Sequence, residues 1–218
     1  MICPSCKAAN QESAGACREC GRPLAAALPT ITRGTVLASR YEIVSPLGRG
    51  GMGMVYKARD RVLEATVAIK TLRPEIAAEP GVAHRFMSEI KLARKVRHEN
   101  VCAIHEYGDD GALRFIAMEL VEGVEVRRIL RERGRLPTDS AFEVTLQVGR
   151  GLQAIHEAGI VHRDLKTSNL MVDAHGLVRL MDFGIARQAG SEFTVAGQIL
   201  GTPDYMSPEQ AQGHRVDL

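Results

Sequence analysis

The pattern of apolar and polar positions predicts a strand-rich part followed by a helix-rich part. Short apolar or alternating runs bounded by turn residues predict strands over 41–44, 54–58, 66–70 and 114–120. Apolar residues at helical spacing predict one helix over 84–96. A longer helix is predicted to open at Pro137, with Thr138 as its cap, and to end at Gly159. Two short strands, 170–172 and 178–181, follow on either side of a turn at 173–176.

Residues 1–40 have a different character. They contain two C-x-x-C pairs, Cys3 with Cys6 and Cys17 with Cys20. Segment 24–33 has no sustained periodicity and contains Pro29, which predicts a linker. We therefore expect a cysteine module over 1–23, a linker over 24–38 and a larger domain over 39–218. A cleft between the strand-rich and helical halves of that domain is where a ligand would bind.

The composition adds mainly exclusions. The chain has 218 residues, of which 45% are hydrophobic and 25% are charged, and its net charge is +2, which is ordinary for a globular protein. No basic stripe predicts nucleic-acid binding, and no apolar run is long enough to span a bilayer. The N-terminus lacks the pattern of a signal peptide. We therefore expect a cytoplasmic location, where cysteines stay reduced.

Reduced, paired cysteines favour a metal site. Two C-x-x-C knuckles can close a tetrahedral site of four thiolates, a donor set that suits structural Zn²⁺. Two disulfides or a redox dithiol are the alternatives, and the reducing compartment disfavours both. A segment this short cannot build an apolar core unaided, so its folding should depend on the metal. Cys102 lies in an apolar run and is expected in the core.

A glycine cluster follows the first predicted strand. Gly48, Gly50 and Gly53 have the spacing G-x-G-x-x-G, which by itself also fits a dinucleotide fold. In that fold the glycines lead into a helix, whereas here they lead into a strand. Such a hairpin can lie over phosphates and bring backbone N–H groups close to them. Lys70, on the next strand, is placed to pair with the α- and β-phosphates, and Glu89 on the following helix is its expected partner. Taken alone, both would be read as surface residues.

The helical half carries a second cluster of polar residues. It contains HRDLKTSN at 162–169 and DFG at 182–184. Asp164 can accept the proton of an attacking hydroxyl, and Lys166 can neutralise a γ-phosphate. Asn169 and Asp182 supply oxygen ligands for Mg²⁺ ions that bridge the phosphates. Each residue alone could be an ordinary loop residue, but the ordered set favours phosphoryl transfer.

These motifs, with GTPDYMSPE at 201–209, carry a family resemblance over residues 41–218. The sequence resembles the eukaryotic-type serine/threonine protein kinases of bacteria, here with an N-terminal zinc ribbon. The resemblance implies an α+β, two-lobed fold with a β-rich N-lobe and a helical C-lobe. It implies transfer of the γ-phosphoryl group of ATP to Ser/Thr hydroxyls of protein substrates, with Mg²⁺ or Mn²⁺ as cofactor, and autophosphorylation through self-association.

The resemblance also assigns roles to residues. The implied catalytic groups are Asp164, Lys166, Lys70 and Glu89. The implied ATP-binding residues are Leu47, Gly48, Arg49, Gly50, Gly51, Met52, Gly53, Met54, Val55, Ala68, Lys70, Met118, Glu119, Val121 and Met171. Among them Met118 is the implied gatekeeper, the backbone of Glu119 and Val121 would meet the adenine edge, and Val55, Ala68 and Met171 would sandwich its ring. The apolar residues are equally well explained as core.

Other residues in the resemblance are regulatory. Lys166 and Thr202 together favour Ser/Thr over Tyr specificity in this family. Arg163 would pair with a phosphate on the activation segment. Thr194 and Ser191 are the candidate acceptors of that phosphate, and ordinary loop hydroxyls are the alternative. Departures from the family are mild, such as Thr167 in place of a common proline.

The resemblance also raises a question about the end of the chain. In the kinase fold, the segment ending at Glu209 precedes a buried helix and several more helices, whereas only residues 210–218 follow here. We therefore expect a C-terminally truncated kinase domain whose helix over 141–155 exposes apolar surface, with a membrane anchor as an option in the missing part. Two hypotheses remain open: an ATP-dependent Ser/Thr protein kinase, and a non-catalytic nucleotide-binding or interaction fragment.

Overall fold

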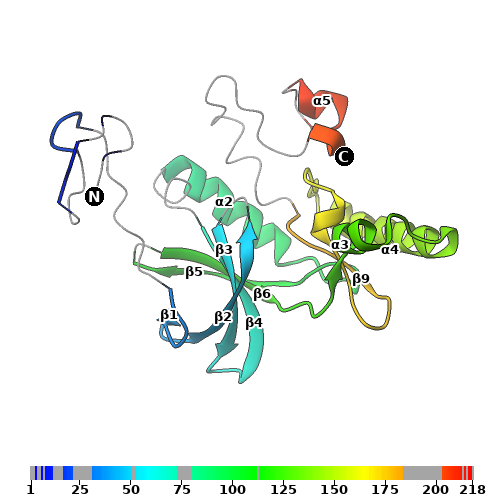
Figure 1. Ribbon diagram of the computed structural model, residues 1–218, viewed down its shortest axis with the longest axis horizontal. Coiled ribbons are helices and arrows are strands. Elements are labelled where there is room, and N and C mark those ends of the chain that lie inside the picture. The colour runs from blue at the N-terminus through cyan, green and yellow to red at the C-terminus, as the bar shows by residue number, and fades with distance from the viewer. Residues whose placement is uncertain are drawn as a thin grey trace.

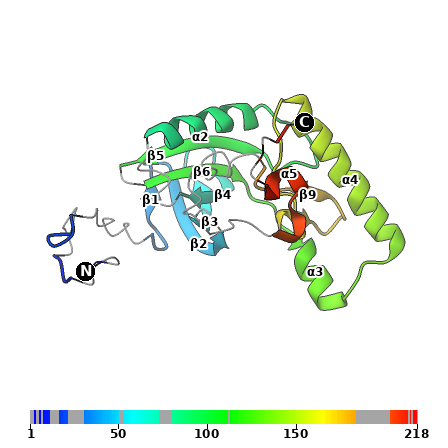
Figure 2. The same cartoon turned by 90° about the horizontal axis from the view of Figure 1, so that it is seen from above.

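A computed structural model of the chain describes residues 3, 6, 8–11, 17–21, 31–50, 53–72, 80–111, 113–183, 203–212, 214 and 216–217, without the side chains of 80–86 and 203. Six strands form one antiparallel sheet in the order β1-β2-β3-β4-β6-β5. They are β1 (Val36–Leu37), β2 (Tyr41–Gly50), β3 (Gly53–Asp60), β4 (Ala65–Thr71), β5 (Ile104–Asp110) and β6 (Leu113–Glu119). Helix α2 (Pro80–Ala93) connects β4 to β5 and lies beside β5 (Figures 1 and 2).

The second half of the domain is helical, with a small sheet at its centre. Helices α3 (Val126–Arg133) and α4 (Thr138–Glu157) accompany strands β7 (Val124–Glu125), β8 (Leu170–Val172) and β9 (Val178–Leu180), which pair in the order β7-β8-β9. Three short helical segments complete it: η1 (Thr167–Asn169), η2 (Pro203–Tyr205) and α5 (Pro208–Ala211). A bridge between Val101 and Leu180 connects the segment before β5 to β9 and so joins the two halves.

Two apolar clusters hold these elements together. One lies on a face of the large sheet and contains Tyr41, Ile69 and Phe115, all at most 1% exposed. The other runs from Ile90 on α2 to Ile155 on α4 and therefore spans both halves. Because this second cluster is continuous, the packing that folds the helical half also fixes its position against the sheet.

A buried polar network attaches α4 to β9. Asn100 donates to the side chain of Gln147 at 3.0 Å and to the backbone of Val178 at 2.9 Å. The same Gln147 oxygen accepts the Val178 N–H at 2.8 Å. Gly151 lets the helix approach closely, since a Cβ at this position would lie 2.8 Å from the Asn100 carbonyl oxygen. The start of the strand that leads to Asp182 is therefore fixed on both sides.

An ion-pair cluster lies where β2 begins. The Arg40 guanidinium donates to both carboxylate oxygens of Asp60, at 2.9 and 2.6 Å, and also contacts Glu106. Tyr41 donates its hydroxyl to Glu106 at 2.5 Å. The bond from Arg40 lowers the pKa of the buried Asp60 carboxyl to about 2. These contacts tie β2, β3 and β5 together. β1, which pairs with β2 just before them, lies inside the linker predicted over 24–38.

Several elements differ from the predictions. The structure adds β1, β5, β7 and α3. α3 was not predicted although Val126, Ile129 and Leu130 have helical spacing, because this stripe spans little more than one turn of an arginine-rich segment. The predicted helix over 84–96 ends at Ala93 and gives way to a turn. Thr138 is the first helical residue rather than the cap: Pro137 occupies the cap position, without a side-chain cap bond.

The exposed face of α4 bears apolar side chains. Phe142 is 70% exposed and Leu146 is 40% exposed, on successive turns of the helix. This confirms the predicted exposure of apolar surface on this helix. Among the described residues, no helix is both long and apolar enough to cross a membrane.

Candidate active site

The loop that precedes β8 holds Asp164 between two nitrogen donors. Lys166 Nζ lies 2.8 Å from Asp164 Oδ2, and Asn169 Nδ2 donates to the same oxygen at 3.0 Å. Asn169 also donates to the Asp164 carbonyl at 2.8 Å and is buried in η1. Because both donors contact Oδ2, the carboxylate is oriented with its other oxygen turned away from them. All three contacts are local in sequence, so the loop can build this group from its own residues.

The opposite wall of the site comes from the large sheet. Lys70, buried on β4, places its Nζ 2.7 Å from Asp182 Oδ1. A buried ammonium needs an anionic partner to stay charged, and Asp182 supplies it from the other half of the domain. Asp182 has a left-handed φ of 57°, a conformation in which Asp is tolerated better than most residues. The pairing of Lys70 with Glu89, which lies half-buried on α2, stays a prediction.

His162 supports the loop from inside. It is 3% exposed, and its Nδ1 accepts the Asp164 N–H at 3.3 Å. Its ring lies 6.5 Å from the ring of the buried Phe183, next to Asp182. Burial lowers the pKa of His162, so the ring is neutral at neutral pH. Its position links the segment of Asp164 to that of Asp182.

The glycine hairpin is formed by β2 and β3. In its register Gly48 faces Val55 and Gly50 faces Gly53, while Gly51 and Met52 lie outside the described residues. A Cβ at Gly53 would meet the Thr71 carbonyl oxygen at 1.9 Å, whereas one at Gly48 would meet no atom within 4 Å. Close packing against Thr71 therefore requires glycine at position 53. At position 48 no protein atom lies close, so a ligand beneath the hairpin could approach the Gly48 backbone. Leu47 and Arg49 are exposed beside it.

An apolar cluster lies at the end of the hairpin. Ala68, Cys102 and Met118 are buried in it, with Val55, Leu120, Val121 and Met181 packed around them. It brings together four residues predicted to surround the adenine, Val55, Ala68, Met118 and Val121. Met171 is half-buried on β8 and is not part of this cluster, so its contact with the adenine ring stays a prediction. The sequence analysis missed Met181, although its place directly before Asp182 is a signal that could have identified it.

The end of β6, where the chain leaves the large sheet, is held by two contacts of Glu119. The Glu119 N–H donates to the Ala103 carbonyl at 2.8 Å, and the Glu119 carboxylate contacts Arg179 at 3.4 Å. These bonds fix the strand end that leads from β6 toward α3. The Glu119 N–H is therefore already bonded within the protein. It does not take part in the contact predicted between the Glu119 backbone and the adenine edge.

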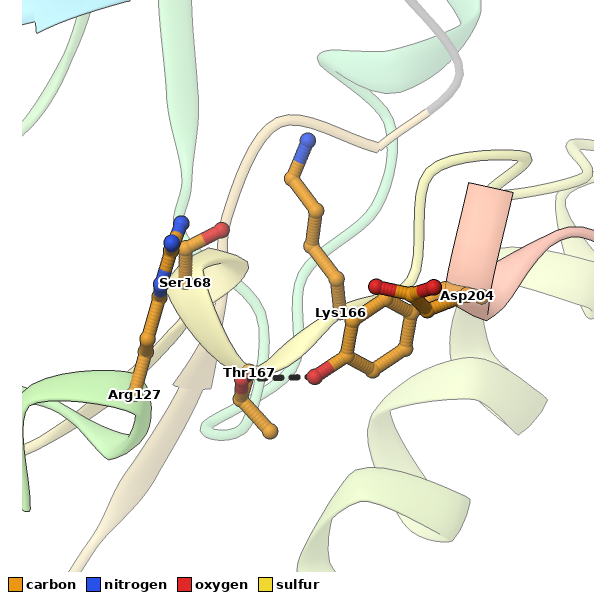
Figure 3. A pocket seen from close by; sticks show the side chains of 6 residues that line it. Arg127, Lys166, Thr167, Ser168 and Asp204 are labelled. Atoms are coloured by element: carbon orange, nitrogen blue, oxygen red, sulfur yellow. Dashed lines mark hydrogen bonds between the residues drawn. The ribbon is translucent and has the colours of Figure 1, made fainter. Parts of the chain in front are cut away.

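A small pocket opens beside Lys166. It has a volume of about 150 Å³ and is lined by Arg127, Lys166, Thr167, Ser168, Asp204 and Tyr205 (Figure 3). The Thr167 hydroxyl lies 3.0 Å from the Tyr205 hydroxyl, so the residue that replaces the family's common proline joins the loop to η2. Gln210 makes a second connection, donating to the Arg163 carbonyl at 2.9 Å. The regulatory candidates Thr194, Ser191 and Thr202 lie outside the described residues.

The four cysteines of the N-terminal module converge. Their sulfur atoms all lie within 4.8 Å of one another, with Cys3 and Cys20 at 3.7 Å and Cys6 and Cys17 at 3.5 Å. None forms a disulfide. A tetrahedron with Zn–S bonds of about 2.3 Å has edges of about 3.8 Å, so the spacing of the sulfurs fits zinc.

The electrostatics of the thiols support the same conclusion. The backbone N–H of Cys20, assisted by that of Glu19, lowers the pKa of Cys17 to about 6. At Cys6 the backbone N–H of Ala8 acts in the same direction, but the thiol of Cys17, burial and the thiols of Cys20 and Cys3 outweigh it and raise the pKa to about 12. The Cys17 thiolate thus forms readily, whereas the Cys6 thiolate is disfavoured without a bound cation.

Comparison with known proteins agrees with this fold and site. The protein kinase domain family matches residues 41–217, and the chain belongs to that family. Its relatives include a probable serine/threonine-protein kinase of Streptomyces coelicolor, 40% identical over 188 residues, and the serine/threonine-protein kinase PknA of Mycobacterium tuberculosis, 36% identical over 187 residues. Each alignment covers 83% of this chain, but only 28% and 43% of the relative. The chain therefore spans less than half the length of the curated relatives it matches.

Solved structures give the same answer for the fold. The crystal structure of the kinase domain of Mycobacterium tuberculosis PknI superposes with a TM-score of 0.71 at 27% identity, covering 86% of this chain and 71% of that one. The predicted two-lobed kinase fold, with an antiparallel sheet in the N-lobe, is confirmed.

Proposed function

We propose that this chain transfers the γ-phosphoryl group of ATP to serine or threonine hydroxyls of proteins. The observation that carries the proposal is the arrangement of Asp164, clamped by Lys166 and Asn169, opposite the Lys70–Asp182 pair. It combines one positioned base, two cations and two oxygen ligands. Phosphoryl transfer depends on such positioning and charge neutralisation rather than on covalent catalysis.

Asp164 acts as the base in this proposal. Its carboxylate accepts the proton of the attacking hydroxyl, and the two donors on Oδ2 keep it oriented toward the substrate. Lys166 then faces the negative charge that develops on the transferred group. Lys70 binds the α- and β-phosphates beneath the glycine hairpin.

The ligands fit Mg²⁺. Asn169 uses its amide nitrogen to hold Asp164, which leaves the amide oxygen as a ligand, and Asp182 contributes a carboxylate. Oxygen donors of this kind suit Mg²⁺ or Mn²⁺. When bound to these oxygens, the ion would neutralise phosphate charge.

Specificity and regulation follow from the family resemblance. Lys166 and Thr202 support Ser/Thr rather than Tyr as acceptor, and Arg163 supports activation by a phosphate on Thr194 or Ser191. In the N-terminal module, Cys3, Cys6, Cys17 and Cys20 hold a structural Zn²⁺. The sulfur spacing and the absence of disulfides support this assignment.

One structural feature favours a second candidate, a non-catalytic nucleotide-binding fragment. The exposed Phe142 and Leu146 on α4 leave the helical half with uncovered apolar surface. Such a half could lack the rigidity that positions Asp164 for turnover, while the glycine hairpin still binds nucleotide.

A paired assay separates the two candidates. The purified chain is incubated with γ-labelled ATP, Mg²⁺ and a Ser/Thr-containing acceptor protein, beside an Asp164→Asn variant. We expect phosphate incorporation by the wild type well above that of the variant. If the wild type incorporates no more phosphate than the variant while calorimetry still shows ATP binding, the non-catalytic candidate is the one that stands.

A further inference from the structure

Helix α3 and the turn after it carry a concentration of positive charge. Residues 125–135 contain five arginines and two glutamates, a local charge of +3, whereas the whole chain carries only +2. The arginines are Arg127, Arg128, Arg131, Arg133 and Arg135. This charge is invisible in the overall composition, and it lies on the element that borders the pocket beside Lys166.

Arg127 is the arginine that reaches this pocket. It extends from α3 toward Ser168, while Asp204 lies on the other side of Lys166 and Thr167 (Figure 3). Its neighbour Arg128 is paired with Glu132 at 2.8 Å. Within the described part of the chain, Arg127 has no carboxylate within ion-pair distance. It is an exposed guanidinium available to an outside anion.

The pocket and the candidate base share a neighbour, Lys166. Lys166 lines the pocket and also contacts Asp164, so a polypeptide whose hydroxyl reaches Asp164 must pass close to this wall. The residues that flank the acceptor would then lie near Arg127 and the Ser168 hydroxyl. A guanidinium recognises carboxylates and phosphates through parallel hydrogen bonds, and nearby arginines add a favourable long-range field.

We propose that this pocket selects protein substrates with an anionic side chain, aspartate, glutamate or a phosphorylated residue, next to the acceptor Ser/Thr, and that Arg127 determines this specificity. The proposal rests on the proposed kinase function and adds the substrate class. Arg127 touches the flanking side chain and not the reacting atoms, so its effect lies in substrate choice. Asp204, on the opposite side, would exclude the anion from its own end of the pocket.

The test compares peptides and charge-reversal variants. Serine peptides in an alanine background carry aspartate, phosphoserine, arginine or no charge at each flanking position in turn. For the wild type we expect one position at which the anionic peptides have a kcat/KM about fivefold above that of the neutral peptide, as suits a partly exposed ion pair. Arg127→Glu should reverse this preference toward arginine, and Arg127→Lys should keep part of it.

Arg128→Glu is the matched control, because Arg128 lies on the same helix and does not line the pocket. It should keep the anionic preference at the same peptide position and lose only the small part that comes from the long-range field. An Arg127→Glu protein with the wild-type preference, or a wild type that prefers basic peptides, would overturn the proposal. Aspartate and phosphoserine peptides distinguish carboxylate from phosphate recognition.

A second measurement separates this proposal from the proposed function. If no peptide is phosphorylated above the level of Asp164→Asn, the kinase function fails. The pocket is then tested by fluorescence anisotropy with labelled aspartate and alanine peptides. Tighter binding of the aspartate peptide that is lost in Arg127→Glu supports the pocket, and equal binding of both peptides refutes it.

Discussion

Lys70 Nζ lies 2.7 Å from Asp182 Oδ1 and joins the sheet of the N-lobe to the segment that follows β9. The lysine side chain is 6% exposed and the aspartate 36%, so the pair has one buried and one accessible partner. The accessible carboxylate can face a metal ion and phosphates, while the buried ammonium holds it in its left-handed conformation. The pair is thus both a lobe contact and a preformed part of the candidate site.

Replacing Lys70 with methionine should reduce phosphoryl transfer by about 100-fold, because one preorganised positive charge at the phosphates is lost. Lys57→Met is the control, since Lys57 lies on the neighbouring strand β3 and makes only a long surface contact with Glu122 at 3.9 Å. Initial rates at saturating ATP measure the effect. A Lys70→Met rate within about twofold of the control would contradict the role of Lys70.

The two glycines of the hairpin should respond differently to alanine. Gly48→Ala should raise the KM for ATP without changing the melting temperature, because a Cβ there meets no protein atom. Gly53→Ala should lower the melting temperature, because its Cβ would collide with the Thr71 carbonyl. Thermal unfolding without ligand and ATP titration separate the two effects. A wild-type KM in Gly48→Ala would argue against phosphates beneath the hairpin.

Gly151 and Gly149 on α4 form a second matched pair. Gly151→Ala should destabilise the domain by about 1–3 kcal/mol, because the added methyl overlaps Leu180 and the Asn100 carbonyl. Gly149→Ala should stabilise it by about 0.5–1 kcal/mol, since that site is exposed, has no neighbour within 4 Å and gains helix propensity. Urea unfolding measures both, and equal shifts would show that α4 does not pack closely on β9.

The buried His162 predicts a pH dependence of stability. Its folded pKa lies below the unfolded value of about 6.5 because burial disfavours the charged ring. The unfolded chain therefore binds the proton first, so this contribution to stability is fully present above about pH 6.5 and is lost as the pH falls through the folded pKa. Titration of the His162 ring by NMR tests the sign: a folded pKa at or above that of a histidine in the denatured chain would refute it.

Zinc binding can be tested with cobalt. Co²⁺ added to the reduced chain should give the absorption bands of a tetrahedral thiolate site with one ion per chain, and Cys17→Ser should abolish them. The Cys102→Ser variant should bind Co²⁺ normally, because Cys102 is buried with Ala68 and Met118 in an apolar cluster of the large domain. Asn10 connects the two knuckles through Ala8, Cys17 and Arg18, so Asn10→Ala should weaken Zn²⁺ affinity by about tenfold. Retained cobalt bands in Cys17→Ser would exclude a four-cysteine site.

Much of the fold followed from periodicity, and the exceptions have physical causes. β4 and β6 were predicted because they are buried and apolar. β5 was missed because only Ile104 is fully buried in it, with polar residues along the rest of the strand. α3 was missed because its few apolar residues are interspersed with exposed arginines. Both form because neighbouring elements hold them, a cause that the local pattern does not reveal.

The chemistry could be inferred from residue types alone: the loop at 162–169, the glycine spacing and the four cysteines indicate what each group can do. The contacts within this loop could also be predicted from the sequence, since Lys166 and Asn169 lie within a few residues of Asp164. The sequence does not reveal that Lys70 meets Asp182, that Met181 rather than Met171 joins the apolar cluster, or that Arg127 shares a pocket with Lys166. Those pairings depend on how distant elements pack, and packing is set by the whole buried surface rather than by any one segment.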